Sequence, residues 1–123
     1  KSNLLEIFLS CCNEKLNTIT IEWYDKKSLC IVLCSKGYPD NFNKNVLIQN
    51  INKIKFSKNE YYYHAGTTVT KNQVYAVGGR VLNFVCLSDN FLEARKKVIS
   101  SINNLDWNGG FYRKDIGYQV INE

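Results

Sequence analysis

Helical spacing of apolar residues marks the start of the chain. Ser2 or Asn3 can cap this helix, and apolar side chains then recur every three or four positions, at Leu4, Leu5, Ile7, Phe8, Cys11, Cys12 and Leu16. Together they form a broad apolar face, wider than packing against one neighbouring element requires. The pattern predicts a helix that packs against a neighbouring domain as well as against its own.

Strand patterns follow this helix. β-forming residues alternate over 18–24, Asp25-Lys26-Lys27 interrupts them, and a continuous apolar run covers 29–34. These two runs predict a hairpin. After a loop that holds the only proline, Pro39, residues 48–56 predict one or two further short strands.

The second half of the chain predicts three strands and a helix. The strands cover 61–64, 73–77 and 80–87, with a turn at 70–72 before the second and the longest apolar run in the third. Asn90 and Glu93 form a capping-box pattern for a helix over 91–103. Its apolar stripe is predicted to contain Leu92, Val98, Ile99 and Ile102.

These elements predict an α+β fold: a mostly antiparallel sheet or half-barrel with flanking helices near each end. At 123 residues the chain is large enough for one hydrophobic core. The net charge of +5 suits a polyanion or a phosphorylated small molecule, although scattered lysines also serve plain solubility. No apolar run is long enough to cross a bilayer, so no membrane partner is expected.

Five cysteines are an odd number for a disulfide framework, and their spacing does not match a zinc site. Cys30 and Cys34 share one face of the predicted strand over 29–34. They and Cys86 are expected to be buried as small apolar side chains, which indicates a reducing cytosol.

The segment from Tyr61 to Leu82 holds the most distinctive chemistry. An aromatic strand ends at His64, the only histidine, and Gly78-Gly79 stand directly before Arg80. Glycines let a backbone approach an anion, and a guanidinium can bind phosphate through two hydrogen bonds. The alternative is a β-hairpin in which the paired glycines form a bulge or a bend.

Four short motifs follow one another along the chain. They are Gly37-Tyr38-Pro39, His64-Ala65-Gly66-Thr67, Gly78-Gly79-Arg80-Val81-Leu82 and Arg113-Lys114-Asp115-Ile116-Gly117. In this order they resemble the C-terminal domain of the phosphoribosylamine–glycine ligase (glycinamide ribonucleotide synthetase) family over nearly the whole chain. Asn45, Tyr63 and Ile99 depart from the residues usual in that family.

The resemblance implies that residues 1–17 are the tail helix of a preceding ATP-grasp domain and residues 18–123 the C-terminal domain. The chain begins with Lys1 rather than Met, so we expect a piece of a longer protein. The implied partners are the N-terminal and ATP-grasp domains of the same chain.

The implied enzyme is cytoplasmic and joins glycine to 5-phosphoribosylamine in purine synthesis, using ATP and Mg²⁺ or Mn²⁺ bound mainly outside these residues. Glycine would be phosphorylated to glycyl phosphate, which the amine of phosphoribosylamine then attacks. The 123 residues show no phosphate-covering loop and no paired metal-binding carboxylates. They are therefore expected to be inactive alone and to close the active site against water.

Arg80, with Gly78 and Gly79, is predicted to bind the 5-phosphate of phosphoribosylamine; the alternative is a salt bridge from Arg80 to Asp115 or another acid. His64 is a candidate to accept a proton from the attacking amine or to contact substrate, and otherwise a structural histidine.

Three further residues are candidates for substrate binding. Thr67, like Thr68, either binds substrate or stabilises a turn. Arg113 or Lys114 either reaches the active-site anions, or an ion pair fixes the C-terminal segment to the sheet, with Asp115 as a candidate helix cap.

Two other classes of function fit parts of the pattern. Tyr61-Tyr62-Tyr63 and the positive charge suit a small nucleic-acid-binding module, although the basic residues do not cluster near these tyrosines. A cysteine hydrolase that uses His64 is disfavoured, because each cysteine lies in an apolar run that suppresses the thiolate.

Overall fold

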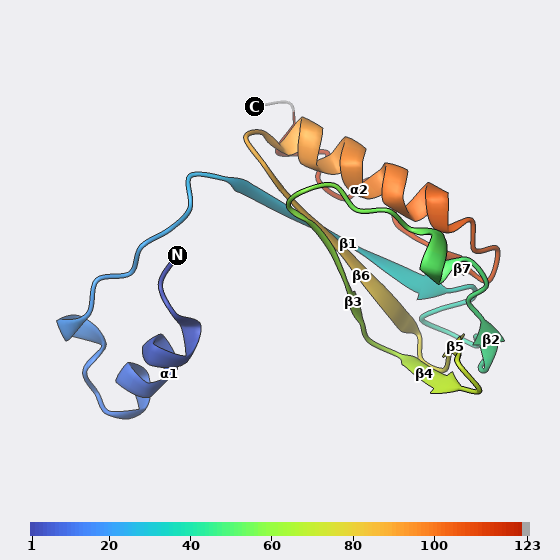
Figure 1. The fold of residues 1–123 in the computed structure, drawn as a ribbon, viewed down its shortest axis with the longest axis horizontal. Helices are drawn as coiled ribbons and strands as arrows, with labels where there is room; N and C mark the ends of the chain where they lie inside the picture. The colour runs from blue at the N-terminus through green and yellow to red at the C-terminus, as the bar shows by residue number, and fades with distance from the viewer. Residues whose placement is uncertain (122–123) are drawn as a thin grey trace.

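The computed structural model describes residues 1–121, which form two antiparallel sheets and two α-helices (Figure 1). The α+β prediction is confirmed. The larger sheet has the strand order β3-β6-β1-β7 and the smaller sheet β2-β5-β4. The elements are α1 (Leu4–Cys12), η1 (Leu16–Thr18), β1 (Lys27–Ser35), β2 (Val46–Leu47), η2 (Ile51–Lys53), β3 (Glu60–His64), β4 (Thr67–Thr70), β5 (Gln73–Ala76), β6 (Arg80–Ser88), α2 (Phe91–Leu105) and β7 (Gly110–Phe111).

Alternation along β1 and β6 builds the core. One face of each strand is buried beneath α2, which crosses one side of the larger sheet in Figure 1. The helix contributes side chains at three- and four-residue spacing. The buried residues from the three elements are Leu29, Ile31 and Leu33, then Leu82, Phe84 and Cys86, then Ala94, Val98, Ile102 and Leu105.

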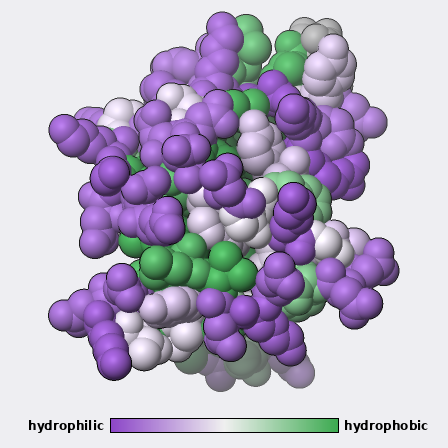
Figure 2. All heavy atoms as spheres, turned by 90° about the vertical axis from the view of Figure 1, so that its right-hand side faces the viewer, coloured by the Kyte–Doolittle hydropathy of each residue, from purple (hydrophilic) through white to green (hydrophobic). Residues whose placement is uncertain are grey.

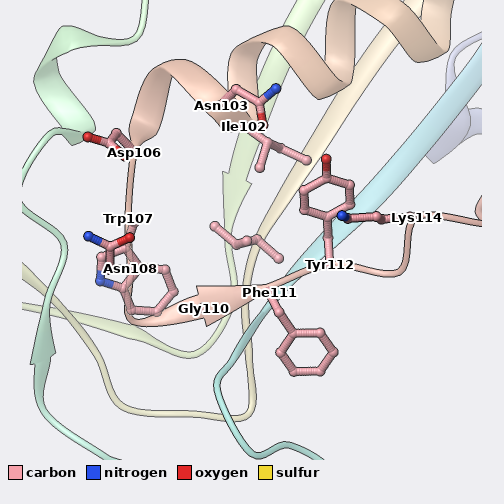
Figure 3. Close-up of a pocket in the computed structure, with 10 residues that line it drawn as sticks. Ile102, Asn103, Asp106, Trp107, Asn108, Gly110, Phe111, Tyr112 and Lys114 are labelled. Atoms are coloured by element: carbon pink, nitrogen blue, oxygen red, sulfur yellow. The ribbon is translucent and has the colours of Figure 1, made fainter.

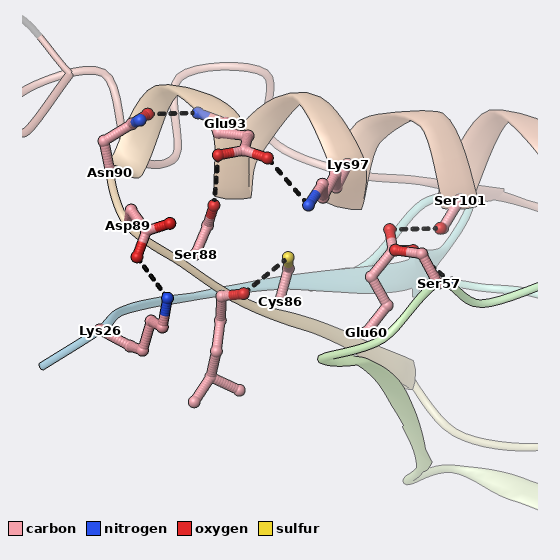
Figure 4. A network of polar contacts seen from close by, with 11 residues as sticks. Lys26, Ser57, Glu60, Cys86, Ser88, Asp89, Asn90, Glu93, Lys97 and Ser101 are labelled. Carbon is pink, nitrogen blue, oxygen red and sulfur yellow. Dashed lines mark hydrogen bonds and ion pairs between the residues drawn. The ribbon is translucent and has the colours of Figure 1, made fainter. Parts of the chain in front are cut away.

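The start of α2 follows the predicted capping pattern. The Asn90 side chain accepts a hydrogen bond from the Glu93 backbone N–H at 2.8 Å. The Glu93 carboxylate pairs with Lys97 at 2.9 Å and accepts a hydrogen bond from Ser88 at 2.7 Å (Figure 4), and these contacts lower the pKa of Glu93. The predicted place of Leu92 in the apolar stripe is wrong, because Leu92 is 46% exposed. Burial of Val98 and Ile102 is confirmed, and Ala94 and Leu105 complete the buried stripe.

Residues 60–88 form one long bent hairpin. β3 pairs with β6, and β4 pairs with β5 around a tight turn at Lys71 and Asn72, both at positive φ. The turn predicted at 70–72 is confirmed, whereas β4 lies where only a turn was expected. The smaller sheet therefore continues the larger one. At the end of the molecule where it lies, the surface is mainly hydrophilic with an apolar band across it (Figure 2).

The hairpin predicted from 18–24 and 29–34 is wrong. β1 pairs with β6 and β7, and residues 19–26 form no strand. Instead, Lys1 and Ser2 donate backbone hydrogen bonds to the carbonyl of Glu22, at 2.9 and 3.2 Å. The N-terminal segment closes on itself and lies apart from the sheets, with no residue of α1 buried (Figure 1).

The strands predicted within 48–56 are also wrong, because only β2, just before this range, is a strand. Ile48 and Ile51 are both buried, with a turn at 49–50 between them and η2 beginning at Ile51. Burial of the cysteines is confirmed only for Cys86. Cys30 is exposed and Cys34 half-buried, because they lie on the face of β1 opposite to α2.

Phe84 is the largest fully buried side chain and should dominate the stability of this core. We expect Phe84→Ala to lower the free energy of unfolding by about 3–5 kcal/mol, since it removes buried area and leaves a cavity. Urea denaturation measures this change. Leu92→Ala, on the outer face of α2, is the matched control and should change stability by less than about 0.5 kcal/mol. Equal losses would contradict the assignment of the core.

Candidate functional site

A β-bulge directs Arg80 to the open face of the larger sheet. Leu33 lies opposite Leu82, but Cys34 lies opposite Arg80, so Val81 is the extra residue in β6. With regular alternation Arg80 would share the α2-covered face with Leu82. Because of the extra residue, Arg80 lies beside Cys34 on the other face, where its side chain is exposed.

Arg80 lines a hollow of about 530 Å³ on this face, which we call the arginine hollow. Val32 and Asn83, directly opposite one another in the β1–β6 ladder, form its floor. The other lining residues are Tyr38, Ala65, Gly66 and Gly79, so Arg80 is the single charged group among them. No ion pair joins Arg80 to another residue within 1–121, and Asp115 pairs with Arg113. The arrangement offers one guanidinium, one amide and one phenol to an anion.

Close backbone packing explains the glycines around Arg80. A Cβ on Gly66 would lie 2.6 Å from the Cα of Gly78, so the two arms of the bent hairpin can touch only without side chains. The Gly66 N–H also donates to the Arg80 carbonyl at 2.8 Å. The prediction that paired glycines form a bend is therefore confirmed. Whether Gly78 and Gly79 also admit a phosphate stays a prediction.

Tyr38 forms the wall of the arginine hollow opposite the bend. A Cβ on Gly79 would lie 2.1 Å from a carbon of the Tyr38 ring, so the ring packs directly over this glycine. Ser35 is buried at the end of β1 and ties the start of the Tyr38 loop to Gly78 and Gly79. Its N–H donates to the Gly79 carbonyl and its hydroxyl to the Gly78 carbonyl, both at 2.8 Å. Tyr38 and Asn83 were not predicted as site residues. The Gly37-Tyr38-Pro39 motif could have indicated the first, but no local signal marks the second.

His64 lies away from the arginine hollow. It is opposite Leu82 in the ladder and follows Tyr62 on the face that carries Phe84. Its Nδ1 lies 2.8 Å from the Thr67 hydroxyl oxygen, and its ring centre lies 5.3 Å from that of Tyr62. His64 and Thr67 are thus brought together across the bend, but not with Arg80. The catalytic role of His64 stays a prediction, and it would act at a different surface.

Arg113 and Lys114 of the C-terminal motif line different hollows. Arg113 lines an apolar one of about 350 Å³ on the open face. Lys114 lines another, of about 460 Å³, near the end of α2, where its side chain lies beside the Tyr112 ring (Figure 3). Neither Arg113 nor Lys114 is among the residues that line the arginine hollow.

Arg113 pairs with Asp115, with 2.5 Å between Nη2 and Oδ2, and the hydrogen bond from Arg113 lowers the pKa of Asp115. Both side chains belong to the same exposed segment, however, so the pair does not fix that segment to the sheet. Arg95 attaches the segment to α2 instead. It donates from Nε to the Ile116 carbonyl at 2.9 Å and from Nη2 to the Lys114 carbonyl.

The cysteines lack the surroundings of a nucleophile. Desolvation by neighbouring atoms raises the pKa of Cys34 and Cys86, and also that of Cys30 although its side chain is exposed, which disfavours the thiolates. His64 has Thr67 as its hydrogen-bond partner, and no bond to a cysteine occurs in the part of the chain that is described. No group of three or more His, Cys, Asp or Glu side chains gathers within 1–121. No helix in this range could span a bilayer.

Comparison with known proteins places this geometry in a family. The sequence model described as "Phosphoribosylglycinamide synthetase, C domain" matches residues 28–119. A phosphoribosylamine–glycine ligase of Agrobacterium fabrum is 37% identical over 121 residues, and one of Caldanaerobacter subterraneus is 36% identical over 116. These alignments cover 98% and 94% of the chain. The crystal structure of the Thermotoga maritima phosphoribosylamine–glycine ligase matches 90% of the chain with a TM-score of 0.67 and 25% identity.

The chain spans about a quarter of the length of these relatives. The aligned part makes up 28% of the Agrobacterium protein and 27% of the Caldanaerobacter protein. It makes up 27% of the Thermotoga chain. The likeness therefore concerns one domain of proteins that contain considerably more.

The contact between Tyr38 and Gly79 can be tested by substitution. We expect Gly79→Ala to lower the free energy of unfolding by about 1–3 kcal/mol, since the added methyl group displaces the ring. Urea unfolding measures the loss. The double change Gly79→Ala with Tyr38→Ala should restore part of it, because the clashing ring is gone. Additive losses would show that the ring does not pack over this glycine.

The attachment of the C-terminal segment gives a second test. Arg95→Ala should destabilise the protein by about 1–2 kcal/mol, since a charged donor to two carbonyls is lost. Asp115→Ala should leave the melting temperature nearly unchanged, because its ion pair is exposed. Thermal unfolding followed by circular dichroism compares the two variants. If Asp115→Ala lowered the melting temperature more than Arg95→Ala, the Arg113–Asp115 ion pair rather than Arg95 would attach the segment.

Proposed function

The chain belongs to the phosphoribosylglycinamide synthetase C-domain family, and we propose from this premise that it is the C-terminal domain of a phosphoribosylamine–glycine ligase. The whole enzyme joins glycine to 5-phosphoribosylamine in purine synthesis and consumes ATP. Activation of the glycine carboxylate by phosphorylation makes it open to attack by the amine. Because an acyl phosphate reacts with water, the domain that closes the site protects the intermediate.

The proposal assigns the phosphate of phosphoribosylamine to the arginine hollow. The carrying observation is that the bulge at Val81 places the Arg80 guanidinium, without an ion-pair partner within 1–121, in an open hollow. A phosphate can accept two parallel hydrogen bonds from such a fork. Asn83 and the Tyr38 hydroxyl can contribute neutral hydrogen bonds beside it. Arg80 therefore binds and orients the substrate and takes no part in proton transfer.

ATP and Mg²⁺ or Mn²⁺ are assigned to the other domains of the enzyme. The described residues gather no metal-ligating cluster, whereas Mg²⁺ bound with nucleotide needs carboxylates close to the phosphates. Residues 1–17 are assigned to the tail of the preceding domain, since no residue of α1 is buried. A reducing cytoplasm suits the five cysteines, all of which are free.

Arg80→Ala in the full-length enzyme tests the proposal. We expect the KM for phosphoribosylamine to rise about 10- to 100-fold, since a charge-assisted hydrogen bond contributes about 1.5–3 kcal/mol. The KM for ATP should change little. Steady-state kinetics with each substrate varied in turn separates the two effects.

Two variants serve as controls for this experiment. Arg80→Lys keeps the charge but loses the fork, so its KM should lie between those of the native enzyme and Arg80→Ala. Lys96→Ala removes an exposed charge on the outside of α2 and should leave both constants unchanged. An unaltered KM for phosphoribosylamine in Arg80→Ala would remove the assignment.

A further inference from the structure

The larger sheet is covered on one face only. α2 lies over one side, and no helix or strand within 1–121 lies over the other (Figure 1). The strand register sets apolar side chains in rows across this open face: Phe111 beside Cys34, and Cys30 beside Val85 and Tyr61. Three large members are exposed, namely Phe111 at 39%, Tyr61 at 44% and Tyr63 at 57%. A soluble domain seldom leaves such a row uncovered.

The open face contains an apolar hollow of about 350 Å³ beside the arginine hollow. Val32, Cys34, Pro39, Phe111 and Ile116 line it, and Arg113 is the single charged lining residue. Val32 and Tyr38 line both hollows, so the two are neighbours with a common wall. Apolar walls offer few hydrogen bonds to a sugar phosphate, but they suit an aliphatic or aromatic side chain.

We infer that this apolar hollow seats apolar side chains from the part of the full-length protein that precedes residue 1. The inference rests on the proposed function, in which this chain is one domain of a ligase. About three quarters of each similar relative lies outside the aligned part. The matching family is described as a C domain, which puts that larger part on the N-terminal side.

The N-terminal segment also exposes large apolar side chains. Residues 4–24 leave eight large apolar side chains exposed, among them Phe8 at 56% and Trp23 at 79%. Of the remaining large apolar side chains that are exposed, Tyr61, Tyr63 and Phe111 lie on the open face, and Val69, Leu92 and Tyr118 lie elsewhere. Residues 4–24 and the open face thus hold most of the exposed large apolar side chains within 1–121.

Seating of this partner would also shape the phosphate site. Tyr38 contacts the apolar hollow on one side, and its ring packs over Gly79 next to Arg80 on the other. A side chain that fills the apolar hollow restricts the Tyr38 ring and so fixes the wall of the arginine hollow. Docking and phosphate binding then depend on each other through one residue.

Thiol labelling of the full-length protein tests the inference without altering the hollow. Cys30 lines the hollow and is exposed in this domain, so docking should cover it. Maleimide labels the thiols, and peptide mapping gives the labelling rate of each cysteine. Each rate is divided by the rate of the same thiol in the urea-unfolded protein. We expect Cys30 to react at least about tenfold more slowly than the thiol introduced by Leu92→Cys on the outer face of α2. Equal rates for the two thiols would overturn the inference.

Two further measurements separate the other outcomes. If protection of Cys30 disappears on dilution together with a dimer seen by sedimentation, a second copy covers the face and the inference fails. Val32→Glu should speed the labelling of Cys30 at least about fivefold and raise the KM for phosphoribosylamine, whereas Leu92→Glu should do neither. A protected Cys30 in a protein without ligase activity would refute the proposed function but keep the docking surface. An active ligase with a reactive Cys30 would do the reverse.

Discussion

One extra residue in the β1–β6 ladder determines what this domain can do. The ladder is otherwise regular, with one face of both strands buried under α2. At Val81 the register changes, and the side chain that follows toward the bend emerges on the opposite face. A buried cation without a partner would cost more than the bulge, so Arg80 can stand beside the core only because it faces away from it.

The core and the candidate site therefore belong to different faces of the same strands. Leu33 and Phe84 stabilise the sheet from the α2 side, while Val32 and Asn83, their neighbours in sequence, line the arginine hollow. Packing of the core fixes the positions of the site residues without using them. The proposed role of closing an active site needs this separation, since such a domain must remain ordered before its partner and substrate arrive.

Local sequence signals predicted the parts that local physics governs. The cap at Asn90, the turn at 70–72 and the buried alternation of β6 are confirmed, since each depends on residues a few positions apart. The strand expected at 18–24 failed because β-forming residues form a strand only with a partner, and β1 takes β6 instead. Whether Cys30 is buried depends on which face of the larger sheet α2 covers. The direction of Arg80 depends on a bulge that alternation does not reveal. Asn83 lines the arginine hollow only because the β1–β6 pairing sets it opposite Val32.

The direct backbone contact between Gly66 and Gly78 limits which substitutions this domain can accept. A methyl group on Gly66 would come within 2.6 Å of the opposite chain, so the contact accepts no larger residue at that position without moving one sheet against the other. Libraries that seek altered substrate preference gain nothing from varying that position. Useful variation belongs in the loop around Tyr38, where a side chain borders the hollow and the chain has no second strand to displace.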